Sequence, residues 1–130
     1  MLIVLTHGGF DHIGNAVFLR EKFGTKIAMH KDDSGMAEHG DMFWNRKTRK
    51  TLIKIIALIL FRFGKSDRFE PDLFIDDGYA FSEYGFSATV LTLPEHSKGS
   101  IGILTAEGNL ICGDLFYNID KPALNSILDN

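Results

Sequence analysis

The sequence predicts an α/β domain with mixed sheets and flanking helices. A strand-like segment, a helical segment and a second strand-like segment follow one another at the N-terminus, which is the order of a βαβ unit. After Pro71 the pattern changes to short β-like segments separated by turn residues. A chain of 130 residues with 45% hydrophobic residues suits one globular domain. We therefore expect residues 1–130 to form a single domain.

Composition and charge exclude several classes of protein. The net charge of −3 and the pI near 5.9 give no electrostatic basis for binding nucleic acid or an anionic membrane. The most apolar run, residues 52–61, falls well short of the roughly 20 residues that span a bilayer. Cys112 is the only cysteine, so no intrachain disulfide is possible, and a reducing setting is favoured. We expect a cytoplasmic protein without a nucleic-acid or membrane partner.

The first three elements are predicted from periodicity. Residues 1–6 are continuously apolar and β-branched, as in a buried strand. Residues 13–23 place apolar side chains at helical spacing, and Gly24 is a typical C-terminal stop. Residues 25–30 alternate as a short strand. Because a helix connects the two strands, we expect them to pair in parallel.

Two helices are predicted before Pro71. Asp32 or Asp33 can cap a short helix that runs to His39. A second helical pattern covers residues 48–63.

Short strands dominate the second half of the chain. They cover residues 72–75, 79–82, 88–93, 100–105 and 109–112. Gly108 predicts a hairpin turn between the last two strands, because glycine readily adopts positive φ. Residues 121–130 have the spacing of a short terminal helix with Pro122 near its first turn.

The most informative motif is Thr-His-Gly-Gly-Phe-Asp-His-Ile-Gly at residues 6–14. It predicts a tight turn between the first strand and the first helix. His7, Asp11 and His12 lie within this turn, and imidazole and carboxylate groups held close together suit a transition-metal site. The alternative is that Asp11 caps the helix and the histidines are solvated loop residues.

Two further segments offer possible ligands. His96 lies in a loop, residues 93–100, directly between two predicted strands. Asp114 follows the strand that ends at Cys112, and ligand-binding groups commonly lie at strand ends in α/β sheets. Each residue also has a structural interpretation, as a solvated loop histidine and as a turn-forming aspartate.

Together the three segments resemble the metallo-β-lactamase superfamily. THGGFDHIGN corresponds to the superfamily's His-x-His-x-Asp-His turn, LPEHSKGSIG to its loop histidine, and ICGDLFY to its bridging aspartate. The resemblance runs in the same order along nearly the whole chain. It implies that the α/β domain is part of a four-layer αββα sandwich.

The resemblance also implies a two-metal site. His7 and His96 would ligate the first metal, Asp11 and His12 the second, and Asp114 would bridge both. Zinc is the expected metal, as one or two ions, with iron or manganese as alternatives. The implied activity is hydrolysis of a small-molecule ester, thioester, lactone, lactam or phosphodiester by a metal-bound hydroxide, with Asp11 as its catalytic orienter.

Two ligand positions of the superfamily lack a suitable side chain here. Gly9 stands at the motif's second histidine, and no histidine follows Asp114. Loss of even an outer partner of a metal ligand typically costs about 10–100-fold in affinity, so a missing imidazole should cost more. We therefore expect either a metal-dependent hydrolase or a degenerate member with weak or absent metal binding and no independent catalysis.

The sequence also predicts a truncated domain. The strands that precede the first metal motif in the superfamily are absent from the sequence, and an incomplete sheet would expose apolar faces and unpaired edges. We expect a homodimer, or pairing with a chain that supplies the missing half. His30, His39 and Trp44 are interpreted as structural residues, because His39 ends a helix, where a cation is favourable, and His30 ends a strand.

Overall fold

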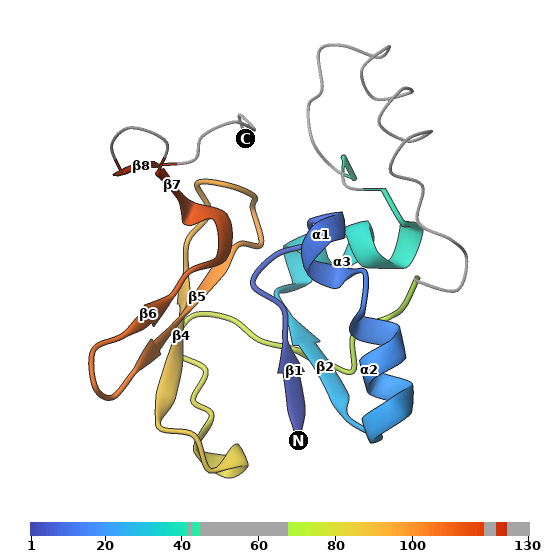
Figure 1. The fold of residues 1–130 in the computed structure, drawn as a ribbon, viewed down its shortest axis with the longest axis horizontal. Coiled ribbons are helices and arrows are strands. Elements are labelled where there is room, and N and C mark those ends of the chain that lie inside the picture. Colours follow the sequence, from blue (N-terminus) through green and yellow to red (C-terminus); the bar gives the residue numbers. More distant parts are fainter. Residues whose placement is uncertain (42, 45–67, 119–121, 125–130) are drawn as a thin grey trace.

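The computed structural model of the chain describes residues 1–41, 43–44, 68–118 and 122–124, and the predicted helix over residues 48–63 lies outside them. Figure 1 shows the arrangement of the elements. The elements before Pro71 are β1 (Leu2–Val4), α1 (Phe10–Ile13), α2 (Ala16–Phe23), β2 (Lys26–Met29) and α3 (Lys31–His39). Those after it are β3 (Leu73–Phe74), η2 (Ser82–Tyr84), β4 (Ala88–Thr92), β5 (Ile101–Thr105), β6 (Leu110–Ile111), η3 (Gly113–Leu115), β7 (Phe116–Asn118) and β8 (Pro122–Leu124).

The N-terminal βαβ unit is confirmed. β1 pairs in parallel with β2, with Ile3 opposite Ile27, and β2 pairs in parallel with β3. Gly24 ends α2 in the left-handed region at φ 58°, where glycine has no Cβ to clash. The predicted strand over residues 72–75 is confirmed as β3, so the first sheet has the strand order β1-β2-β3.

The first helix begins earlier than the sequence predicts. α1 starts at Phe10, is interrupted at Gly14 and Asn15, and continues as α2 from Ala16. The backbone carbonyl of Gly9 accepts hydrogen bonds from two later amides, at 3.0 and 3.1 Å, which starts the helical turn inside the motif. Asp11 and His12 therefore lie in a helical turn and not in a loop.

The predicted cap of α3 was wrong. His30 is the N-cap residue, and its Nδ1 accepts a hydrogen bond of 3.1 Å from the backbone N–H of Asp32. Neither Asp32 nor Asp33 caps the helix. The carboxylate of Asp33 is fully buried and accepts hydrogen bonds from other segments of the chain.

The second half forms an antiparallel sheet in the order β4-β5-β6. The hairpin between β5 and β6 is confirmed, with Gly108 at φ 85°. The predicted strand over residues 79–82 is reduced to a single bridge between Ala80 and Thr89, followed by η2. The terminal helix predicted over residues 121–130 was wrong at its start, because residues 122–124 form the strand β8, which pairs with β7. Residues 125–130 lie outside the part of the chain that the structure describes. Proline is compatible with β8 because each strand of a two-stranded pair is an edge strand.

Alternation along β2 organises the core into two clusters. Ile27 and Met29 pack with Ile13 and other residues of the helices, whereas Ala28 packs with Val90 and the rest of the antiparallel sheet. The result is a helix layer, a parallel sheet and an antiparallel sheet, in that order (Figure 1). The predicted mixed α/β class is confirmed, and the described residues supply three layers of the predicted αββα sandwich.

One edge of the parallel sheet is unpaired in the part of the chain that the structure describes. β1 has β2 as its neighbour on one side, and Met1 is highly exposed. The homodimer, or the second chain, stays a prediction. Among the described helices none is both long and apolar enough to cross a membrane.

Candidate metal centre

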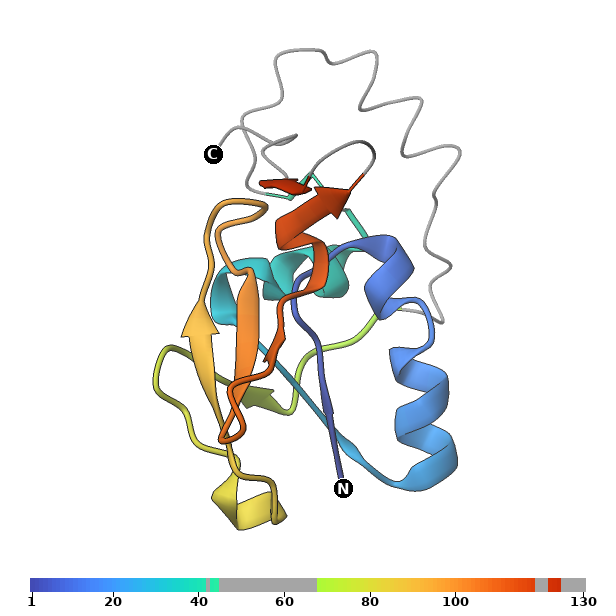
Figure 2. The same cartoon turned by 60° about the vertical axis from the view of Figure 1, so that its left-hand side comes forward.

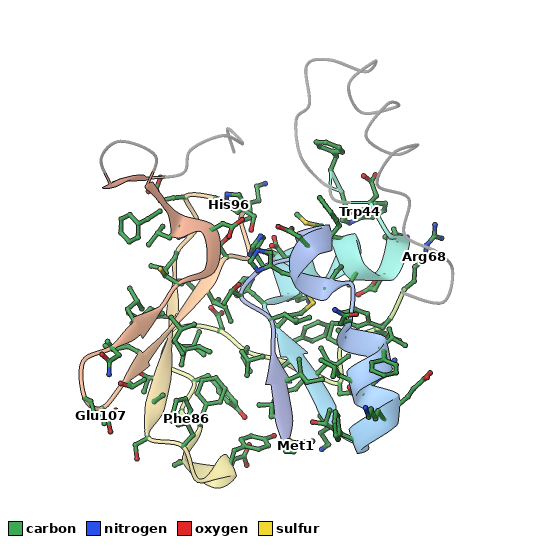
Figure 3. All side chains as sticks on the ribbon, viewed as in Figure 1. Met1, Trp44, Arg68, Phe86, His96 and Glu107 are labelled. Atoms are coloured by element: carbon green, nitrogen blue, oxygen red, sulfur yellow. The ribbon has the colours of Figure 1, made fainter. Side chains whose placement is uncertain are left out.

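Three segments that lie far apart in the sequence meet at one end of the molecule. The loop between β4 and β5, the η3 turn before β7, and α1 all lie opposite the N-terminus in Figure 2. The sheets are tied together there, since the backbone N–H of Ile101 donates to the carbonyl oxygen of Thr6 at 2.8 Å. Figure 3 shows His96 at this end, above the junction of the two sheets.

The structure brings together all five residues that the sequence predicts for the site. His7 follows β1, Asp11 and His12 lie on α1, His96 lies between β4 and β5, and Asp114 lies in η3. They form two groups of possible metal ligands that share Asp114. We call His7, His96 and Asp114 the first group, and Asp11, His12 and Asp114 the second group.

The first group is built from three separate segments. One ligand atom from each residue lies within 4.8 Å of the others. The rings of His7 and His96 meet edge to face, with centroids 4.8 Å apart. The Nε2 atom of His7 lies 3.9 Å from Oδ2 of Asp114.

The second group is tighter and more exposed. His12 Nε2 lies 3.2 Å from Oδ1 of Asp114 and 3.6 Å from Oδ2 of Asp11. The Asp11 side chain is 58% exposed, whereas that of His7 is 2% exposed. The two oxygens of Asp114 face different histidines, so this carboxylate contributes one possible ligand atom to each group.

Burial keeps His7 in its neutral form. Desolvation, followed by the nearby rings of His12 and His96, lowers the pKa of His7 to about 4. Its Nδ1 lies 3.3 Å from Oγ1 of Thr6. In the tautomer whose Nδ1–H donates to this hydroxyl, the Nε2 lone pair faces Asp114. A neutral imidazole with a defined free nitrogen is the form that binds a metal ion.

Gly9 faces the same space. A Cβ atom at this position would lie 2.7 Å from Nε2 of His7 and 3.0 Å from Oδ1 of Asp11. A side chain at residue 9 would therefore project into the ligand cluster, and the ends of these two side chains would have to shift. This geometry supports the assignment of Gly9 to a ligand position that has lost its side chain.

A second glycine, Gly113, allows Asp114 to lie close to the end of β1. Gly113 has φ 54°, and a Cβ there would lie 2.5 Å from Oγ1 of Thr6. The absence of a side chain allows η3 to approach the end of β1 closely, and this brings Asp114 beside His7. The sequence predicts no role for Gly113, because its neighbour Thr6 is distant in sequence.

One buried carboxylate beside the site was not predicted from the sequence. Asp33 accepts hydrogen bonds from the loop of His7, through Gly8 N at 2.9 Å, and from the loop of His96, through Ser97 Oγ at 2.6 Å and Gly99 N at 3.0 Å. The one available signal was two consecutive aspartates at the start of a helix. That pattern is equally typical of a helix cap, so it could not identify the role.

The remaining histidines make other contacts. His30 Nε2 lies 3.2 Å from Oδ1 of Asp76, and His39 stacks on Trp44 with ring centroids 3.8 Å apart. Within the described residues, neither histidine belongs to a group that could hold a metal ion. These contacts agree with the prediction that His30 and His39 are structural.

The donor chemistry of the cluster fits a divalent transition metal. The first group offers two imidazoles and a carboxylate, and the second offers one imidazole and two carboxylates. Zinc, iron and manganese all accept such nitrogen and oxygen sets, so the set does not select one metal. Because residue 9 is glycine, it contributes no side-chain ligand atom to the first group.

Comparisons with known proteins agree with this geometry. The model of the Metallo-beta-lactamase superfamily matches residues 2–130. Over 121 residues the chain is 30% identical to the hydroxyacylglutathione hydrolase GloC of Haemophilus influenzae, covering 89% of this chain and 50% of GloC. The chain therefore spans half the length of this curated relative.

Two solved structures are similar in fold. TTHA1623 in a di-iron-bound form superposes with a TM-score of 0.66 at 23% identity, covering 97% of this chain and 59% of that one. The B3 metallo-beta-lactamase BLEG-1 superposes with a TM-score of 0.64 at 23% identity, covering 91% of this chain and 51% of that one. Both similarities concern the fold.

Proposed function

This chain belongs to the metallo-beta-lactamase superfamily, and from that premise we propose that it is a metal-dependent hydrolase. The observation that supports the proposal is the convergence of two ligand groups on Asp114. Such an arrangement suits two ions a few ångströms apart, because one carboxylate can bind both. When bound, the ions would activate a water molecule at neutral pH and polarise the oxygen of the scissile group.

We propose zinc as the metal, with iron or manganese as alternatives. The di-iron form of TTHA1623 supports an iron-containing centre as one possibility within this fold. Neutral imidazoles and carboxylates bind all three metals, and availability in the cell influences which one is loaded. Metal identity therefore has to be measured on the purified protein.

Each residue of the cluster has a distinct proposed role. His7 supplies a nitrogen ligand from a buried position, and the half-buried His96 and His12 supply one each. Asp114 holds both groups together. The exposed carboxylate of Asp11 has one oxygen directed toward His12, and its other oxygen can accept a proton from the attacking water and orient it.

We propose a thioester as the first substrate class to test. The relative GloC is named as a hydroxyacylglutathione hydrolase, and an acylglutathione contains an acyl–sulfur bond. Esters, lactones, lactams and phosphodiesters remain in the proposal, because a fold with an activated water serves many electrophiles.

A degenerate member without independent catalysis is the second candidate. Gly9 faces the ligand cluster without a side chain. This feature favours weak metal binding at the first group. Such a chain would act as a structural or binding fragment.

A hydrolysis panel distinguishes the two candidates. The purified chain is loaded with zinc, iron or manganese and assayed on a hydroxyacylglutathione, an aryl ester, a lactone, a lactam and a phosphodiester. The hydrolase proposal predicts turnover of at least one substrate that a chelator abolishes and added metal restores. A protein that binds metal but turns over none of the panel would favour the degenerate candidate.

A further inference from the structure

We propose that Asp33 is a positioning residue that fixes the spacing between His7 and His96. The inference rests on the proposed function, since it concerns residues that would bind the metal. Asp33 lies on α3, outside both ligand groups, and its side chain is fully buried. A fully buried carboxylate is uncommon unless it has partners, so its contacts indicate what it does.

The carboxylate joins two loops that are distant in sequence. Its Oδ2 accepts from Gly8 N at 2.9 Å and from Ser97 Oγ at 2.6 Å, and its Oδ1 accepts from Gly99 N at 3.0 Å. Gly8 is the residue after His7, and Ser97 is the residue after His96. One side chain therefore binds both the loop of His7, which follows β1 of the parallel sheet, and the loop of His96, which connects β4 and β5 of the antiparallel sheet.

Close packing leaves the two loops little freedom. A Cβ atom at Gly99 would lie 2.7–2.8 Å from atoms of Asp33, including its backbone N. A Cβ atom at Gly8 would lie 2.7 Å from Sδ of Met36 and 3.0 Å from the carbonyl oxygen of Asp33. Both loops therefore rest directly on the first turns of α3, and glycine is required at each contact.

The chemistry of the contact requires a carboxylate. Three donors converge on two acceptor oxygens, and hydrogen bonds to a charged acceptor are roughly twice as strong as neutral ones. Asparagine has the same shape, but its NH₂ group would face a donor in place of an acceptor. Asp33→Asn should therefore release at least one loop while preserving the volume of the side chain.

The chain offers a matched control and a milder variant. Asp32 is the preceding residue on the same helix and is exposed, so Asp32→Asn makes the same chemical change away from both loops. Ser97→Ala removes one of the three donors and releases the His96 side alone. Ser97 Oγ also lies 2.6 Å from Ser100 Oγ, so the double variant Asp33→Asn/Ser97→Ala isolates the contact with Asp33.

The experiment measures metal affinity by competition with a chromophoric chelator, using zinc alone as the probe, for the full 130-residue chain. Thermal unfolding of each metal-free variant sets a temperature at which all are folded. Visible absorption of the cobalt-loaded forms reports ligand geometry. Hydrogen exchange of the Gly8 and Gly99 amides in the metal-free protein reports loop release without any metal.

We expect Asp33→Asn to weaken zinc affinity about 10–100-fold, the scale of lost outer-shell partners. It should alter the cobalt spectrum and raise exchange at both glycine amides. Ser97→Ala should have a smaller effect, and the double variant should match Asp33→Asn. Asp32→Asn should behave as the wild type in every measurement.

Two results would overturn the inference. If folded Asp33→Asn and Ser97→Ala bind zinc as tightly as the wild type and only their thermal stability falls, Asp33 is a structural residue and the proposed function stands. If the wild type itself binds no metal, the proposed function fails, and the positioning role fails with it. The exchange data alone then report what Asp33 does for the loops.

Discussion

The two ligand groups of the candidate centre are built in opposite ways. The second group takes Asp11 and His12 from one helical turn, and both are accessible to solvent. The first group takes His7 and His96 from two different sheets, and His7 is buried. One group is thus formed by local sequence, and the other depends on the folding of distant segments.

This difference shows where the sequence and the fold each limit metal binding. The first group has the more constrained environment, with Asp33 joining its two loops, yet it is the group to which residue 9, a glycine, adds no side chain. The second group has its ligands within one turn but lies exposed, where water competes for the metal. Because both groups share Asp114, a substitution in one group should also change metal binding at the other.

Removal of the shared carboxylate should have the largest effect. Asp114→Asn takes a ligand from both groups, and we expect it to weaken metal binding by more than about 100-fold, since even outer-shell losses reach that scale. Chelator competition and hydrolysis assays measure the change. Asp76→Asn is the matched control, because Asp76 contacts only a structural histidine, His30, within the described ion pairs. Equal affinity in the two variants would show that Asp114 is not shared.

The buried histidine should make stability depend on pH. The pKa of His7 is about 4 in the folded chain and about 6.5 when unfolded, so between these values the unfolded chain binds a proton that the folded chain does not. Acidification across this window should remove about 3 kcal/mol from the free energy of unfolding of the metal-free protein. Urea titrations at several pH values measure it. The His7→Asn variant should lose most of this pH dependence, and the control His39→Asn should lose none. If the free energy of unfolding falls equally with pH in the wild type and in both variants, His7 is not its cause.

A histidine at residue 9 should strengthen metal binding at the first group relative to the second. Gly9→His would place an imidazole in the first group, with small shifts of His7 and Asp11, and we expect zinc affinity to rise about tenfold or more. Gly9→Ala is the control, because it adds a Cβ in the same space without a donor. A histidine variant that binds zinc no better than the alanine variant would mean that residue 9 does not face the metal.

The smallest effect is expected at the histidines outside both groups. His30→Asn and His39→Asn should leave zinc affinity unchanged, because these side chains contact Asp76 and Trp44. Isothermal titration with zinc measures this. A clear loss of affinity in either variant would show that the centre extends beyond the five residues.

Local patterns predicted much of the fold. The strands β1, β2, β4 and β5 follow from continuous or alternating apolar runs, and the turn at Gly108 follows from the conformational freedom of glycine. The start of α1 could not be predicted, because it depends on which amides reach the carbonyl of Gly9. β8 could not be predicted either, since a three-residue strand exists only through its pairing with β7.

The five candidate ligands of the site could be predicted from the sequence, but the buried carboxylate beside them could not. His7, Asp11, His12, His96 and Asp114 stand in short motifs whose order resembles the superfamily. Asp33 escaped prediction because its donors lie 25, 64 and 66 residues away, and no local rule connects them. The pairing of this chain with a second copy or another chain stays a prediction.

Anomalous X-ray diffraction from crystals of the zinc-loaded protein tests the central claim most directly, because it locates the ions and their ligands together. We predict anomalous peaks on either side of Asp114, one bounded by His7 and His96 and one by Asp11 and His12, with the first peak weaker because Gly9 supplies no ligand. A single strong peak elsewhere, such as between His30 and Asp76, or no peak at saturating zinc, would contradict the assignment of the metal centre.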